Sequence, residues 1–158
     1  MNMKKDRQPY APPRAEVEDV VEIRPRPITG VVVGAVVDLG GTVIAAVILA
    51  IAYSAYLTSQ GVDPQAIQEA LATAPVGSAY FNIAAAVGLL FSVLGGYVCA
   101  AYARRNLYRT GLVLAAIVSA VGFLVGGTTH SELYNVTIVA ANSAAVLFGA
   151  WWYRRKHA

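Results

Sequence analysis

The sequence predicts an all-α, polytopic membrane protein in which four transmembrane helices form a compact bundle packed through small residues. Of its 158 residues, 57% are hydrophobic and only 13% are charged, whereas a soluble domain carries about 25% charged residues. Eleven of the twenty-one Lys, Arg, Asp and Glu residues lie in the first 26 positions. The remainder contains four segments with the roughly 20 mostly apolar residues needed to cross a bilayer.

Residues 1–27 are predicted to form a disordered cytoplasmic tail. Five of the seven prolines lie there, and charges of both signs alternate along it. Such a composition buries too little apolar surface to fold alone. One piece, AEVEDVVEI, places Val17, Val20 and Val21 on one helical face, so a short helix could form against a partner.

The transmembrane domain is predicted over residues 28–153, with helices at about 28–57, 78–103, 107–126 and 133–153. The valine-rich start of the first span would favour a strand in water. In lipid, however, a spanning backbone must satisfy its own hydrogen bonds, which favours a helix. Residues 154–158 are expected to form a basic cytoplasmic tail.

The connection between the first two spans has its own pattern. Asp63 suits a helix N-cap and Pro64 suits the first helical position. We therefore expect a short amphipathic helix over about 63–74, lying at the outer membrane surface. An irregular loop is the alternative.

The basic residues predict the orientation of the chain. All Lys and Arg fall in the tail (Lys4, Lys5, Arg7, Arg14, Arg24, Arg26), between the second and third spans (Arg104, Arg105, Arg109), and after the fourth span (Arg154, Arg155, Lys156). Four crossings put all three groups on one side, which the positive-inside rule makes cytoplasmic. We expect a multi-pass membrane protein with both termini in the cytoplasm.

Small residues recur at helical spacing along each predicted span. Such residues let helix backbones approach closely, which drives association in lipid. The glycines expected to pack the helices are Gly34, Gly41, Gly88, Gly95, Gly111, Gly122, Gly126 and Gly149. On the third span this seam would leave Leu114 and Val118 facing lipid. The bundle is expected to stand in a homo-oligomer or beside another membrane protein.

Asp38 lies within the first apolar run and is the candidate functional residue. Counted from the cytoplasmic ends, Asp38, Ser92, Ser119 and Asn142 are each ten to fifteen residues in, so they could form one polar layer about 15 Å deep. An intramembrane ionisable residue is a functional hypothesis by default. In the alternative placement, Leu39 to Val62 spans unaided and Asp38 lies at the cytoplasmic interface, where a carboxylate near a helix N-terminus costs little.

No motif indicates an enzyme or a bound cofactor. The chain lacks a nucleophile elbow, HExxH, a P-loop, a dinucleotide fingerprint and CxxC. Its two histidines and single cysteine are too few and too scattered to indicate a metal site. The net charge of +3 reflects topology and contact with lipid headgroups, so no nucleic-acid partner is expected.

One short stretch carries a resemblance. The segment GGYVCAAYARR, residues 95–105, resembles the end of the second helix in small uncharacterised bacterial inner-membrane proteins with four helices. The resemblance covers eleven residues and implies a bacterial origin, but it assigns no catalytic or binding residue.

Three functions are open at this point. The first hypothesis is a non-enzymatic inner-membrane protein that acts by helix–helix association, as an accessory or scaffold subunit. The second is a small oligomeric transporter or channel that uses Asp38 as an ion or proton site. The third is a membrane anchor whose N-terminal tail binds a cytoplasmic partner.

The predicted orientation can be tested with reporter fusions. Fusions after Tyr10, Arg105 and Ala158 should report a cytoplasmic location, because every basic cluster lies on that side. Fusions near Gln68 and Thr129 should report an external one. An external signal at Arg105 would contradict the four-span topology.

Overall fold

The computed structural model describes residues 26–104, 106–126 and 132–157, and these form helices joined by short connections without any strand. Four segments are long and apolar enough to span a membrane: Pro27–Ser59, Ala79–Ala103, Leu107–Leu124 and Tyr134–His157. The chain therefore has the architecture of a multi-pass membrane protein. The predicted tail lies outside the described residues, except for Arg26 and Pro27.

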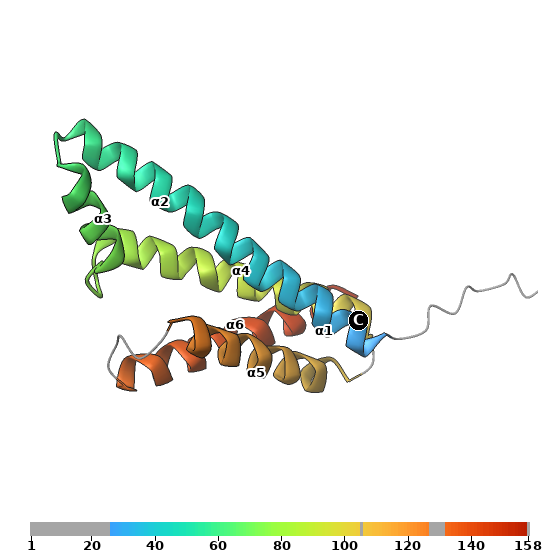
Figure 1. The fold of residues 1–158 in the computed structure, drawn as a ribbon. Coiled ribbons are helices and arrows are strands. Elements are labelled where there is room, and N and C mark those ends of the chain that lie inside the picture. The colour runs from blue at the N-terminus through green and yellow to red at the C-terminus, as the bar shows by residue number, and fades with distance from the viewer. Residues whose placement is uncertain (1–25, 105, 127–131, 158) are drawn as a thin grey trace, which may run out of the picture.

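The first span is one long helix with a local change of winding. It comprises α1 (Pro27–Ala35), the π-helical turn η1 (Val36–Gly40) and α2 (Gly41–Ser59), and it forms a continuous rod (Figure 1). Its 33 residues correspond to about 50 Å at 1.5 Å per residue. Because this exceeds a hydrocarbon core of roughly 30 Å, the helix must tilt or project beyond it. The π turn was not predicted from the sequence.

The connection after the first span contains a helix, α3 (Pro64–Ala72). The Asp63 carboxylate caps it by accepting a hydrogen bond from the Gln65 backbone N–H at 3.0 Å, as the sequence predicts. Ile67 is the buried residue of α3. The next helix, α4 (Ala79–Ala103), is capped by Ser78, whose hydroxyl accepts a hydrogen bond from the Phe81 N–H at 3.2 Å.

The last two helices are α5 (Leu107–Gly126) and α6 (Glu132–His157). The basic residues Arg154, Arg155 and Lys156 belong to the last turn of α6, and the predicted separate tail over 154–158 is corrected accordingly. Cations are stabilised at a helix C-terminus by the unpaired carbonyls and the macrodipole, which explains why the helix continues through them.

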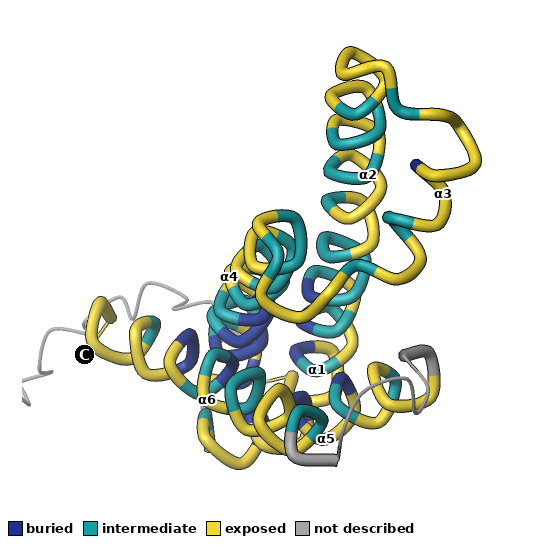
Figure 2. The backbone as a smooth tube through the Cα atoms, turned by 90° about the vertical axis from the view of Figure 1, so that its left-hand side faces the viewer, coloured by how far each residue is buried: buried dark blue, intermediate teal, exposed yellow. Residues whose placement is uncertain are grey.

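Helix α4 is the central element, since it packs against α1, η1, α2, α5 and α6. The rod of α1 and α2 lies beside α4 near α1 but diverges from it towards α3, while α5 and α6 lie on the other side (Figure 1). Dark blue, the colour of buried residues, collects on α1, α4, α5 and α6, and α2 has none (Figure 2).

The buried residues of these helices divide the bundle into two parts. One part holds every buried residue of the four spans, and we call it the closed half. It comprises residues 30–38, 92–103, 110–118 and 146–150. The remaining part, which includes α2 and the start of α4, is the open half. Close packing is thus confined to the half that contains the two ends of the described chain.

Glycines set the helix spacing in the closed half. A Cβ built at Gly34 would lie 2.8 Å from the carbonyl oxygen of Gly95, and a Cβ at Gly95 would lie 2.8 Å from that of Gly34. A Cβ on Gly96 would strike the Val146 backbone, and one on Gly149 would strike the Val93 carbonyl oxygen. Real side-chain carbons do not approach backbone this closely, so α1 and α6 reach α4 only through glycine.

The other predicted packing glycines differ. The Phe91 ring occupies the space that a Cβ on Gly41 would need. The nearest atoms to such a carbon lie at 3.8 Å for Gly88, in the Thr42 methyl group, and at 3.5 Å for Gly111, in Leu147, so both positions have room for a methyl group. Gly126 ends α5, beyond the part of that helix whose packing is described.

The prediction for the third span is wrong for Gly122, Leu114 and Val118. Gly122 is exposed, and a Cβ there would meet no atom within 4 Å. The buried face of α5 includes Gly111 and Ala115, as predicted, together with Thr110, Leu114 and Val118, and Leu114 is completely buried. Leu114 and Val118 therefore pack in the closed half rather than against lipid. A small-residue seam does not fix helix rotation here, because a large side chain fills the space between α1, α4 and α6.

Gly149→Ala should lower the thermal stability of the protein in detergent, whereas Gly122→Ala should not. The new methyl group at Gly149 meets backbone of α4, and overpacking of this kind costs about 1–3 kcal/mol. Both changes gain the same intrinsic helix propensity, about 1 kcal/mol, which makes Gly122→Ala a matched control. Equal melting temperatures for the two variants would contradict glycine-limited packing.

Candidate functional site

Asp38 lies inside the bundle, at the junction of α1 and α2. It is the twelfth of the 33 residues of its span, and only 2% of it is exposed. The surrounding π turn contains one more residue per turn than an α-helix, and such turns are frequent at functional sites. The structure thus places Asp38 among the helices and away from a helix N-terminus, whereas its depth in the bilayer, on which the two placements differ, stays a prediction.

Ser92 of α4 and Asn142 of α6 join Asp38 in a polar cluster. The Ser92 hydroxyl lies 3.0 Å from Asp38 Oδ1 and forms a second, shorter contact with Asn142 Oδ1. It also lies 3.1 Å from the carbonyl oxygen of Gly88, four residues earlier on its own helix. These contacts link the first, second and fourth spans through one hydroxyl group.

Ser119, the fourth residue of the predicted layer, is not hydrogen-bonded to the cluster. Its Oγ is buried and has no hydrogen-bond partner among the described residues. The same is true of Asp38 Oδ2, the second oxygen of the carboxyl group. Buried polar atoms are normally paired, so these two are unsatisfied positions beside the cluster.

The cluster contains more acceptors than protons when Asp38 is ionised. A hydroxyl group has one hydrogen to donate, yet Ser92 Oγ has three acceptor oxygens within hydrogen-bond distance. A protonated Asp38 would donate to Ser92, which could then donate to Asn142 or Gly88. Turning the Asn142 amide so that Nδ2 faces Ser92 would also supply a donor. The arrangement can therefore accommodate a change in protonation.

A cavity of about 540 Å³ adjoins the cluster in the open half. All four spans contribute to its walls. Its lining is mainly apolar, with Asp38, Thr42, Ser92, Ser119, Tyr134, Asn135 and Asn142 as the polar residues. No Lys, Arg, His or Glu lines it within the described chain. The site is thus an apolar cavity with one carboxyl group and several hydroxyl and amide groups.

The closed half blocks one end of this cavity. Beyond Asp38, the buried side chains of Cys99, Leu114, Ala115, Val118 and Val146 pack together, and Val31, Ala35 and Leu39 pack against them. This apolar core occupies the space between the helices. The cavity therefore has access from one half of the bundle and not from the other.

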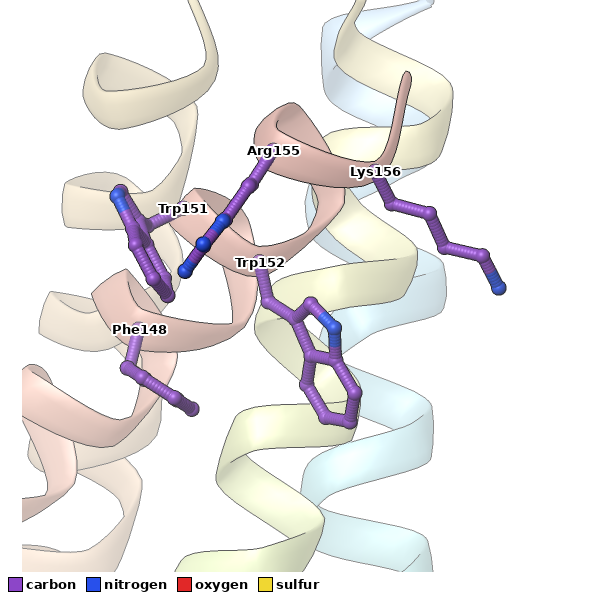
Figure 3. Close-up of a pocket in the computed structure, with 5 residues that line it drawn as sticks. All are labelled: Phe148, Trp151, Trp152, Arg155 and Lys156. Atoms are coloured by element: carbon purple, nitrogen blue, oxygen red, sulfur yellow. The ribbon is translucent and has the colours of Figure 1, made fainter. Parts of the chain in front are cut away.

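A second cavity, of about 510 Å³, lies at the end of α6 and is lined by Phe148, Trp151, Trp152, Arg155 and Lys156. The Arg155 side chain extends beside Trp151, with its guanidinium carbon 5.5 Å from the ring centroid, and Lys156 points away from that pair (Figure 3). Aromatic and basic side chains in this combination are typical of the membrane–water interface.

Comparison of the chain with family models, curated proteins and solved structures finds no match. Within the described chain, no three His, Cys, Asp or Glu side chains gather as a protein metal site would need. The polar groups available are the Asp38 carboxyl group, the hydroxyls of Thr42, Ser92, Ser119 and Tyr134, and the amides of Asn135 and Asn142.

The polar residues were predicted from their depth along each span, but the cavity, the π turn, Gly96 and Val146 were not. Gly96 and Val146 set the distance between α4 and α6. Gly95, which was predicted as a packing glycine, also helps to hold the cluster together, since a Cβ there would lie 2.9 Å from that of Asp38. The double glycine at positions 95 and 96 was the available signal, because it offers one small face to each neighbour.

Ser92→Ala should destabilise the protein and Ser119→Ala should not. Removal of the Ser92 hydroxyl leaves buried Asp38 Oδ1 unpaired, at a cost of about 1–3 kcal/mol. Removal of the Ser119 hydroxyl breaks no hydrogen bond. Thermal unfolding in detergent compares the two, and an equally stable Ser92→Ala variant would show that the cluster contributes nothing to folding.

Proposed function

We propose that this chain is a small membrane transporter in which Asp38 serves as an ion or proton site. The observation that carries the proposal is the buried carboxyl group beside a cavity lined by all four spans. An unpaired carboxylate oxygen in apolar surroundings is costly, so a purely structural role would favour a neutral residue. The cost of the buried carboxylate is explained if the site binds and releases a cation or a proton.

A transporter is favoured over an open channel because the cavity ends at Asp38. A channel needs a continuous path, whereas the apolar core around Leu114 and Val146 closes the other half. A carrier exposes its site to one side at a time. With both termini in the cytoplasm, as the basic residues predict, the cavity would open towards the outer side.

The scaffold hypothesis has less support from the packing. It relied on small-residue seams that would bind other helices. The close glycine contacts at Gly34, Gly95, Gly96 and Gly149 are made within the chain and are not available to a partner. The anchor hypothesis depends on residues outside the described part of the chain and stays a prediction.

The setting we propose for this activity is a bacterial inner membrane, with the protein present as an oligomer. The twelve Lys and Arg residues on one predicted side and the local resemblance of GGYVCAAYARR support that location. The aromatic and basic residues at the end of α6 suit a headgroup region.

Asp38→Asn should abolish proton or sodium flux in liposomes and leave the fold intact. Asparagine keeps the shape and most of the hydrogen bonding of aspartate but removes the titratable charge. Flux should fall to the leak rate of empty liposomes, and the melting temperature in detergent should change little. Asp63→Asn is the matched control, since Asp63 is exposed and asparagine caps a helix equally well.

Asp38→Leu separates this role from a structural one. It should destabilise the protein, because it removes the acceptor of Ser92 and crowds Gly95. Absence of flux from the unmodified protein in gradients of both ions would contradict the transporter proposal. So would an Asp38→Asn variant that transports normally.

A further inference from the structure

The chemistry of the cavity indicates the charge of its ligand. Asp38 is the one residue in its lining that can carry a full negative charge at neutral pH, and no positive side chain in the described chain lines it. Asp38 Oδ2 and Ser119 Oγ are buried and have no hydrogen-bond partner in the part of the chain that the structure describes. A carboxylate in this position lacks its counter-ion, and a ligand with one positive charge would supply it.

The walls indicate the rest of the ligand. Twelve of the nineteen lining residues are Ala, Gly, Val, Leu, Ile or Phe. The cavity, at about 540 Å³, falls in the range of small-molecule sites, about 300–1,000 Å³. A bare metal cation is a poor match, because hard cations need about six oxygen ligands around one point. An organic cation with an apolar body fits both the size and the lining.

We propose that the cavity binds a lipophilic organic ammonium ion, with its charge at Asp38 and its apolar body against α2, α4, α5 and α6. This deepens the proposed function by naming its substrate class, and it rests on that function only for transport. In the free protein Asp38 carries a proton, which completes the hydrogen bonding of Ser92. When the ammonium ion binds, the carboxyl O–H bond breaks, the proton leaves to solvent and the carboxylate pairs with the cation. The positive charge of the ammonium ion thus replaces that of the released proton.

Few other groups around Asp38 can titrate. Cys99 of α4 lies one turn beyond Gly95, within the apolar core, and Tyr134 of α6 lines the same cavity. α5 contributes Ser119 to the cavity, and the rest of α1, η1 and α2 contributes only Leu39, Thr42 and Val43. The proton released on binding is therefore assigned to Asp38.

The test is binding of benzyltrimethylammonium to the purified full chain in detergent, with neopentylbenzene as its uncharged isostere. We expect saturable binding of the cation that the isostere does not displace. The apparent Kd should fall about tenfold per pH unit while Asp38 is protonated in the free protein, because one proton is exchanged for one cation. A pH indicator dye should report the released proton.

Two variants separate charge from space. Asp38→Asn should weaken cation binding by about 30-fold or more, as expected when one partner of a buried charge pair is removed, and should abolish proton release. Gly122→Leu places a branched side chain at the cavity wall, where a Cβ meets no other atom. It should weaken binding while leaving Asp38 and the closed half unchanged. It also keeps the proposal testable if the Asp38 variant does not fold.

Three results would overturn the inference: equal affinity of Asp38→Asn for the cation, displacement by the uncharged isostere, or an affinity that does not depend on pH. Failure of transport gives a different pattern. Cation binding without flux in liposomes would leave this inference intact and contradict the transporter proposal. Proton or sodium flux without binding of benzyltrimethylammonium would contradict this inference and leave the transporter proposal intact.

Discussion

The whole arrangement depends on how closely α4 approaches its neighbours. Lipid offers no hydrophobic drive for helices to associate, so the association depends on close packing and polar contacts. The reciprocal contact of Gly34 and Gly95 brings the first span against α4, and Gly96 and Gly149 bring α6 against its other side. Asp38 and Asn142 can then both reach Ser92, which lies one turn from these glycines. The polar cluster is a consequence of backbone contact.

In the open half the helices are held apart rather than in backbone contact, and this is why a cavity lies there. Rings take the place of glycines between the helices. Phe91 lies against Gly41, Tyr53 and Tyr80 stack with centroids 4.8 Å apart, and Phe81 lies 5.7 Å from Tyr134. The aromatic rings hold the helices apart in the open half, and the glycine contacts hold them together in the closed half. The helices therefore diverge from Asp38 towards the open half. The cavity is therefore bounded by the same contacts that close the bundle elsewhere.

Apolar length was sufficient to predict the four spans, and the pair Asp63 and Pro64 was sufficient to predict the capped helix between the first two. Depth along each span was sufficient to choose Asp38, Ser92, Ser119 and Asn142 together. Rotation was not predictable in the same way, because alanine and glycine are common on every face. On α5, the shape of the space between three other helices determines that Leu114 is buried and Gly122 is exposed. The π turn was likewise not predicted, because nothing in the residue pattern of Val36–Gly40 distinguishes it from the α-helix on either side.

A single carboxyl group in an apolar bundle can be tolerated in two ways. It can be permanently protonated and act as a hydrogen-bonded structural residue, or it can exchange its proton for another cation. The hydrogen bonds of Ser92 fit the protonated form, but they leave Asp38 Oδ2 unpaired beside a cavity far larger than a proton requires. A structural aspartate needs no cavity, and close packing elsewhere in the bundle shows that the chain can fill such space. The combination of an unpaired oxygen, an apolar cavity and the lack of a counter-ion among the described residues favours exchange.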